Sequence, residues 1–231
     1  MKSRHPGSIG AAIGDPKITA VLQRLHGAAA GQRFQIVRDL APAFLRGALG
    51  KKPSWDELSA RARGLYLPLS PEQGTFCYLM ARAIGARRIV EFGTSFGIST
   101  LYFAAAVRDN GGGTVIGTEL VAEKVAAARK NLADAGLAEF AEIREGDALL
   151  TLKDEKDPID MALLDGWKDG YMPVIRMIGP LVRSGGVVIG DNIFTFKRDL
   201  RPYVEHMQDP ANGFRSSTLH LGDGTEFSVK L

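Results

Sequence analysis

Five short runs of apolar and β-branched residues, separated by stretches with helical spacing, constrain the fold of this chain more than any other feature. They lie at 88–92, 114–118, 140–145, 159–164 and 186–190. Short strands that alternate with helices form parallel sheets with helices on both faces. Two further runs, at 215–221 and 225–230, flank a Gly-Asp-Gly turn and predict an antiparallel hairpin. We therefore expect a doubly wound α/β fold with a seven-stranded, mostly parallel sheet.

The segment before the first strand is predicted to be helical. Apolar residues recur with helical spacing at 16–30 and again at 32–48, where Pro42 should kink or break the second helix. We expect residues 1–69 to form an N-terminal helical cap that belongs to the same domain as residues 70–231.

A further helix start is visible at residues 70–73, Ser-Pro-Glu-Gln. The serine is a hydroxyl N-cap, the proline suits the first helical position, and Gln73 stands where a capping box needs a glutamine. This pattern predicts a helix from 71 to about 84.

The composition excludes several classes of protein. A single cysteine, Cys77, cannot form an internal disulfide framework, and the start of the chain lacks the apolar segment of a secretory signal. The apolar runs are far shorter than the roughly 20 residues that span a bilayer. The net charge is +3, and the excess cations are scattered singly over the first 69 residues. We expect a cytoplasmic protein with no membrane or nucleic-acid partner, and the apolar faces of the helical leader predict a homodimer.

Every predicted strand of the parallel sheet brings a carboxylate to its C-terminal end. These acids are Glu91, Glu119, Asp147, Asp165 and Asp191. Ligands of open parallel sheets bind beyond the carboxyl ends of the strands. Acids also cap helices, which explains one or two of the five but not the whole set. The pattern therefore predicts an acidic ligand-binding edge.

The turn after the first strand favours a nucleoside ligand. Gly93 and Gly97 allow the backbone to approach a ligand closely, although their spacing is not that of dinucleotide-binding turns. Glu119 stands where such folds place an acid that accepts hydrogen bonds from ribose hydroxyls. Five carboxylates would repel the phosphates of NAD or ATP, whereas S-adenosylmethionine carries a sulfonium, an ammonium and no phosphate. We expect Glu91 near its methionine end and Asp147 with Ala148 near its adenine.

The sequence resembles the class I S-adenosylmethionine-dependent O-methyltransferases of the catechol O-methyltransferase type, which are related to the caffeoyl-CoA O-methyltransferases. The resemblance covers roughly residues 66–231 and is carried by V-E-F-G-T-S-F-G-I-S-T, L-L-D-G-W-K-D-G-Y and V-V-I-G-D-N. It implies a Rossmann-like fold. The resemblance and the reasoning above together predict a set of cofactor-binding residues. They are Glu91, Gly93, Thr94, Ser95, Gly97, Ser99, Glu119, Leu120, Asp147, Ala148, Asp165 and Trp167.

A metal site is predicted at the ends of the fourth and fifth strands. Asp165, Asp191 and Asn192 offer three hard oxygen ligands, a set that Mg²⁺ accepts while it keeps positions for water and substrate. Two adjacent phenolic oxygens on that ion would be acidified and held in place. Lys168 follows Asp165 by three residues, and the resemblance also implies that it is the catalytic base. The predicted reaction is methyl transfer to a phenolic hydroxyl of a small ortho-dihydroxy aromatic molecule.

The sequence departs from the animal catechol enzymes at two positions and leaves alternatives open. Gly166 replaces a histidine that touches the adenine, and His220 falls near a glutamate that orients the second hydroxyl, so His220 is not placed in the catalytic set. An acyl-CoA thioester substrate stays an alternative, as does a nonenzymatic nucleoside-binding module. An NAD-dependent oxidoreductase is disfavoured by the glycine spacing.

Overall fold

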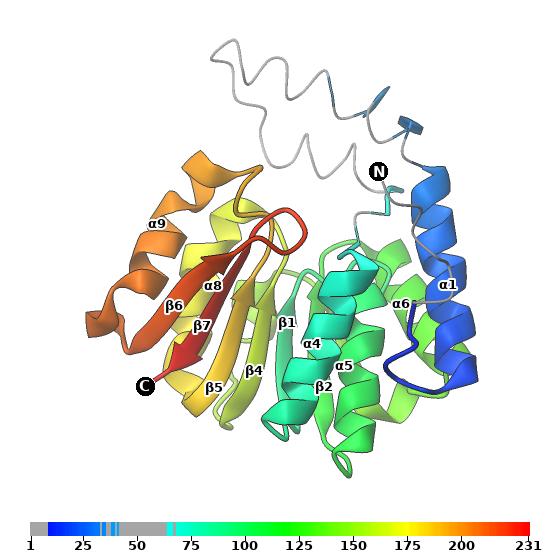
Figure 1. Ribbon diagram of the computed structural model, residues 1–231, viewed down its shortest axis with the longest axis horizontal. Helices are drawn as coiled ribbons and strands as arrows, with labels where there is room; N and C mark the ends of the chain where they lie inside the picture. Colours follow the sequence, from blue (N-terminus) through cyan, green and yellow to red (C-terminus); the bar gives the residue numbers. More distant parts are fainter. Residues whose placement is uncertain (1–8, 33, 36–37, 40, 42–63, 67) are drawn as a thin grey trace.

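The computed structural model describes residues 9–32, 34–35, 38–39, 41, 64–66 and 68–231, which are coloured in Figure 1. The first predicted helix is present as α1, Pro16–Gly31, and its N-cap Asp15 accepts hydrogen bonds from the two backbone amides of Lys17 and Ile18. The prediction of a second helix over 32–48, broken near Pro42, lies largely outside the described residues.

A seven-stranded sheet with the strand order β3-β2-β1-β4-β5-β7-β6 forms the centre of the protein (Figure 1). Strands β1 to β5 all run parallel to one another. Strand β7 pairs antiparallel with both β5 and β6. The strands are β1 Arg88–Phe92, β2 Thr114–Glu119, β3 Ala141–Glu145, β4 Ile159–Leu164, β5 Val182–Gly190, β6 Phe214–Leu219 and β7 Thr225–Lys230. The predicted fold class and its C-terminal hairpin are confirmed.

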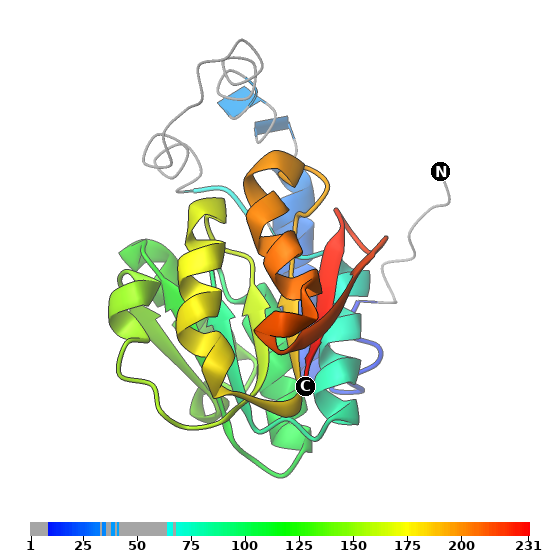
Figure 2. The same ribbon diagram turned by 90° about the vertical axis from the view of Figure 1, so that its left-hand side faces the viewer.

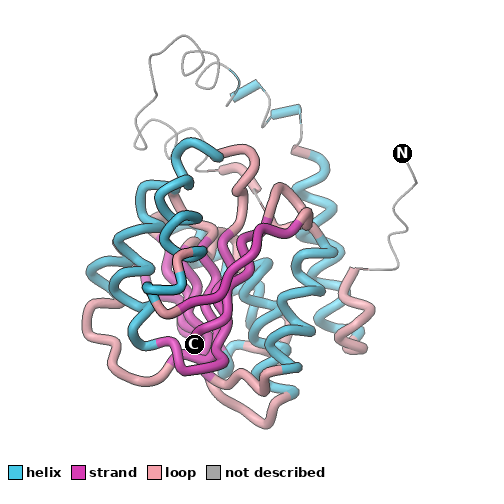
Figure 3. The backbone as a smooth tube through the Cα atoms, turned by 60° about the vertical axis from the view of Figure 1, so that its left-hand side comes forward, coloured by secondary structure: helices cyan, strands magenta, loops and turns pink. Residues whose placement is uncertain are grey.

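Helices cover both faces of this sheet (Figures 2 and 3). On one face α4, α5 and α6 pack against the strands, and α1 lies outside them against α5 and α6. On the other face α8 and α9 form the layer, beside the short α7. These helices are α4 Pro71–Ala83, α5 Ile98–Asp109, α6 Ala122–Asp134, α7 Ala148–Thr151, α8 Tyr171–Ile178 and α9 Lys197–Gln208.

Most residues of the central strands β1 and β4 are buried because helices cover both faces of the sheet. In β1 the side chain of Ile89 joins the core under α4 and α5, and that of Val90 joins the core under α8 and α9. Successive side chains of a strand point to opposite faces, so both layers need apolar residues. In the described part of the chain, no helix combines the length and the apolar character needed to cross a membrane.

The two largest differences from the predicted strand boundaries have a physical reason. β5 begins at Val182 instead of 186, because its early residues Arg183 and Ser184 are partly or fully exposed and interrupt the apolar pattern. β6 ends at Leu219 instead of Leu221, because the Leu221 carbonyl already belongs to the hairpin turn and accepts a hydrogen bond from the Gly224 amide at 3.2 Å.

The predicted capping box at the start of α4 is confirmed. The Ser70 hydroxyl accepts a hydrogen bond from the Gln73 backbone amide at 3.2 Å, and Gln73 Oε1 accepts one from the Ser70 backbone amide at 3.0 Å. This helix therefore begins at a defined residue beside the C-terminal edge of the sheet.

Candidate active site

The C-terminal ends of β1 and β4 lie too close together for side chains at two positions. A Cβ on Gly93, whose φ is +98°, would lie 2.6 Å from the backbone of Gly166. A Cβ on Gly166 would lie 2.6 Å from the ring of Phe92. Contacts this short exclude a larger residue without rearrangement. The glycine at 166, where the animal catechol enzymes have a histidine, is thus explained by the ring of Phe92.

The turn between β1 and α5 is held by Glu119 at the end of β2. Ser95 has a φ of +49°, an uncommon conformation for a residue with a side chain. Its backbone amide donates to Glu119 Oε2 at 2.8 Å, and the backbone amide of Val121 donates to Glu119 Oε1 at 2.9 Å. The acid predicted to bind ribose therefore also fixes the glycine turn.

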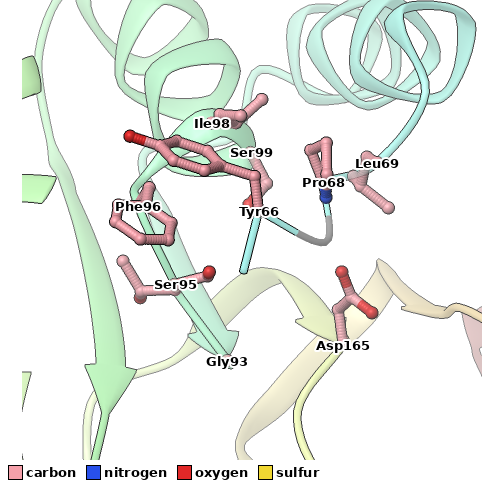
Figure 4. A pocket seen from close by; sticks show the side chains of 10 residues that line it. Tyr66, Pro68, Leu69, Gly93, Ser95, Phe96, Ile98, Ser99 and Asp165 are labelled. Carbon is pink, nitrogen blue, oxygen red and sulfur yellow. The ribbon is translucent and has the colours of Figure 1, made fainter. Parts of the chain in front are cut away.

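A small pocket, partly open to solvent, lies between this turn, Asp165 and the segment before α4 (Figure 4). Tyr66 forms one wall by stacking on Phe96, with ring centroids 3.8 Å apart and ring planes at 11°. Gln32, just after α1, holds this wall by accepting a hydrogen bond from the Tyr66 backbone amide at 2.9 Å. The predicted cofactor residues that line the pocket are Gly93, Thr94, Ser95, Ser99 and Asp165.

Glu91 lies beneath the turn and does not line this pocket. It is fully buried, and its Oε2 accepts hydrogen bonds from the hydroxyls of Thr94 and Thr100. Its Oε1 has no hydrogen-bond partner in the described part of the protein. Burial raises the pKa of Glu91, and the neighbouring hydroxyls of Ser99, Thr100 and Thr94 oppose that rise.

The other predicted cofactor residues do not line the pocket. Asp147 is exposed and caps α7 by accepting a hydrogen bond from the Leu149 amide at 2.9 Å. Of the rest, Gly97 is the N-cap of α5, Leu120 is exposed beside Glu119, Ala148 is buried in the core under α8, and Trp167 precedes a single helical turn at Lys168–Gly170. Contacts between these residues and a cofactor stay predictions.

Asp165 and Asp191 place two carboxylates at the ends of the neighbouring strands β4 and β5. Burial raises the pKa of Asp165 well above its ordinary value, and the charge of Asp191 raises it further. Burial also raises the pKa of Asp191. Asn192, with a φ of +61°, donates through Nδ2 to Asp191 Oδ2 at 3.0 Å. The structure thus brings the three predicted metal ligands to one edge of the sheet.

Lys168 lies among these three residues. Its Nζ is 2.7 Å from Asn192 Oδ1 and 3.7 Å from Asp165 Oδ1, and it donates to the Tyr171 hydroxyl at 3.1 Å. Its side chain is only 5% exposed. Burial lowers the pKa of Lys168, while the charges of Asp165 and Asp191 oppose that change. An amine in this environment is suited to accept a proton from a neighbouring group.

Gln73, Tyr171 and Asp223 contribute to this edge although the sequence analysis gave them no role in the site. Gln73 Nε2 donates to Asp191 Oδ1 at 2.6 Å. The Tyr171 hydroxyl accepts from Lys168 and donates to the Asp191 carbonyl at 3.0 Å. Asp223, in the hairpin turn, accepts a hydrogen bond on its carbonyl from the Phe194 amide at 3.0 Å. These contacts tie α4, α8 and the hairpin to the end of β5.

The oxygen donors at this edge fit a hard divalent cation. Two carboxylates and an amide oxygen are ligands of the kind that Mg²⁺ accepts together with water. The described residues contain no group of three His, Cys, Asp or Glu side chains suited to a metal, so an ion at this edge would need the amide oxygen of Asn192 as its third donor. The two buried acids repel each other, and Lys168 supplies one positive charge beside them. A divalent cation would relieve this repulsion more completely.

Comparison with known proteins places the chain in a family. A protein-family model described as a methyltransferase domain matches residues 90–193. A catechol O-methyltransferase from Niastella koreensis is 33% identical over 164 residues, which cover 69% of this chain and 72% of that protein. A caffeoyl-CoA O-methyltransferase from Zea mays is 28% identical over 142 residues, which cover 59% of this chain and 53% of that protein.

A solved structure gives the same result. The O-methyltransferase from Bacillus cereus in complex with SAH matches with a TM-score of 0.66 and 26% identity, over 90% of this chain and 100% of that one. The chain has the fold of that enzyme. The alignment with the catechol enzyme from Niastella koreensis covers most of both sequences. The chain therefore belongs to the S-adenosylmethionine-dependent O-methyltransferase family that includes the catechol O-methyltransferases.

Proposed function

We propose that this protein transfers the methyl group of S-adenosylmethionine to a phenolic hydroxyl of an ortho-dihydroxy aromatic compound, with Mg²⁺ held by Asp165, Asp191 and Asn192. The observation that carries the proposal is the position of Lys168, a buried amine 2.7 Å from Asn192 Oδ1 and beside Asp165. Buried charged groups are costly, and a protein that only binds nucleosides would gain nothing from this arrangement.

Lys168 is the group that takes the phenolic proton. A phenol titrates near pH 10, so at neutral pH it is a poor nucleophile. When bound, a divalent cation supplies Lewis acidity that lowers the pKa of adjacent hydroxyls and orients them. Burial lowers the pKa of Lys168, which favours the neutral amine that can receive the proton. The Tyr171 hydroxyl fixes the position of Nζ through its hydrogen bond at 3.1 Å.

The pocket beside the glycine turn would bring the methyl group of the cofactor to this edge. The glycine turn and Asp165 would hold its methionine end, and Glu119 would accept hydrogen bonds from its ribose. The phenolate oxygen then forms a bond to the methyl carbon while the bond from that carbon to sulfur breaks. The electron pair stays on sulfur, so neutral adenosylhomocysteine leaves and the proton resides on Lys168. Holding oxygen, carbon and sulfur in line is the main contribution of the site.

Aromatic side chains beside Asn192 support an aromatic substrate. Phe194 is 42% exposed, and its ring centroid lies 5.0 Å from that of His220 in the hairpin. Phe196 is half-buried, and its ring centroid lies 5.4 Å from Lys168 Nζ. An exposed ring such as that of Phe194, next to the oxygen donors, can pack against a phenol.

Methyl transfer from labelled S-adenosylmethionine, measured across a matched set of acceptors, tests this proposal. Catechol and caffeate, with adjacent hydroxyls, should accept the methyl group in the presence of Mg²⁺. Resorcinol, whose hydroxyls cannot chelate one ion together, should not. Transfer to caffeoyl-CoA alone would assign the acyl-thioester substrate instead. Binding of adenosylhomocysteine without transfer to any of these acceptors would contradict the proposal.

A further inference from the structure

Gln73 contacts three parts of the chain that meet at the proposed metal site. Its Nε2 donates to Asp191 Oδ1 at 2.6 Å and to Thr225 Oγ1 at 3.4 Å. Its Oε1 accepts from the Ser70 backbone amide at 3.0 Å. The residue is only 5% exposed. A single buried amide therefore joins the start of α4, the end of β5 and the start of β7.

The contact with Asp191 goes beyond what helix capping requires. A capping box needs the glutamine oxygen, which reaches back to the N-cap amide. The nitrogen is free for another partner, and it is the nitrogen that donates to the carboxylate. Asn192 donates to the other oxygen of Asp191. An ionised carboxylate has about four acceptor positions, so these two amides fix its orientation and leave each oxygen able to bind a cation.

The hairpin turn leaves space for this side chain. A Cβ on Gly222 would lie 2.1 Å from Gln73 Cδ, and the φ of Gly222 is +60°. Any side chain at position 222 would therefore push the Gln73 amide away from Asp191. The glycine in the hairpin turn thus leaves room for the Gln73 side chain.

We propose that Gln73 is a positioning residue that orients Asp191 for the divalent cation. The inference rests on the proposed metal-dependent function and adds a residue from outside the ligand set. Residues that orient a metal ligand commonly affect metal affinity nearly as much as the ligands themselves.

Titration of Mn²⁺ into the metal-free protein, followed by electron paramagnetic resonance, tests the inference without any need for turnover. Gln73→Met keeps most of the volume and removes the amide. It should raise the Mn²⁺ dissociation constant by about 10- to 100-fold and leave the affinity for adenosylhomocysteine unchanged. Ser70→Ala is the matched control, because it removes the capping hydroxyl and retains the contact between Gln73 and Asp191. Its Mn²⁺ affinity should equal that of the parent.

A second pair of variants separates displacement of Gln73 from backbone strain. Gly222→Ala displaces the amide without removing any polar group, and it should weaken Mn²⁺ binding as Gln73→Met does. Gly85→Ala adds the same strain, since Gly85 has a φ of +61°, but nothing lies within 4 Å of its Cβ. It should bind Mn²⁺ as the parent does.

The possible outcomes distinguish the inference from the function on which it rests. If Gln73→Met and Gly222→Ala bind Mn²⁺ as tightly as the parent, Gln73 only caps α4 and the inference is wrong. If they lose adenosylhomocysteine together with Mn²⁺, Gln73 stabilises the whole edge, and the inference is equally wrong. A parent protein that binds no Mn²⁺ contradicts the proposed function itself.

Discussion

Lys168 illustrates how a single residue is tuned by opposing effects. Burial favours its neutral amine, whereas the charges of Asp165 and Asp191 favour the ammonium. The hydrogen bonds from Nζ to Asn192 and Tyr171 keep the group at the acidic edge in either state. The same residue can therefore neutralise part of the acidic charge and accept a proton during the reaction.

Replacing Lys168 with methionine tests this role. The change keeps most of the side-chain volume and removes the titrating amine, so kcat should fall on the order of 10² to 10⁴ fold. Affinity for adenosylhomocysteine should be nearly intact, because Lys168 does not line the cofactor pocket. Part of the rate should return as the pH rises, since hydroxide can then remove the proton. A kcat within about twofold of the parent at pH 7 would make Lys168 a structural residue only.

Glu91 predicts a pH-dependent stability whose sign follows from its pKa. Burial is the largest cause that raises this pKa above 4.5, and the charge of Glu119 adds to it. The folded chain therefore favours the protonated carboxyl, which contributes to stability at low pH. This contribution is lost as the pH rises from 4.5 through the folded-state pKa, because ionisation favours the unfolded chain. Glu91→Gln lacks the effect. Its thermal midpoint relative to that of the parent, measured without cofactor, should increase between about pH 4.5 and 8. A pH-independent difference would contradict the assignment.

At the scale of elements, the regular parts of the fold were predictable and the contacts between distant segments were not. The five parallel strands could be located because short runs with apolar and β-branched residues alternate with stretches of helical spacing. The capping box identified Gln73 correctly, yet its bond to Asp191 joins residues 118 positions apart. No local pattern reports such a contact. The stack of Tyr66 on Phe96 was missed for the same reason.

The close approach of β1 and β4 gives a prediction at this scale. Gly166→Ala places a methyl group against Phe92 and should lower the free energy of unfolding by about 1 to 3 kcal/mol. Phe92→Leu in the same chain should restore part of that loss by making room. Gly31→Ala is the control, because nothing lies within 4 Å of its Cβ, and it should be neutral or slightly stabilising. Denaturant unfolding measures all four proteins, and a Gly166→Ala variant as stable as the parent would refute the steric argument.

At the scale of the whole molecule, the C-terminal edge of the sheet carries two groups of residues. The pocket proposed for the cofactor lies at the turn after β1, and the acidic oxygen donors follow β4 and β5. The hairpin closes over the second group through hydrogen bonds from Ile193 and Phe194 to the carbonyls of Gly224 and Asp223, both at 3.0 Å. The predicted homodimer and cytoplasmic location stay predictions, as does the helical cap beyond α1.

The central claim is that Asp165, Asp191 and Asn192 hold an ion that the reaction requires. The most direct measurement is the initial rate of methyl transfer to catechol in the presence of excess chelator and after Mg²⁺ is restored, with binding of adenosylhomocysteine followed in parallel. We predict that the rate disappears with the chelator and returns with Mg²⁺, while adenosylhomocysteine binds throughout because its pocket is formed by the glycine turn and Tyr66. Full activity in excess chelator would contradict the claim.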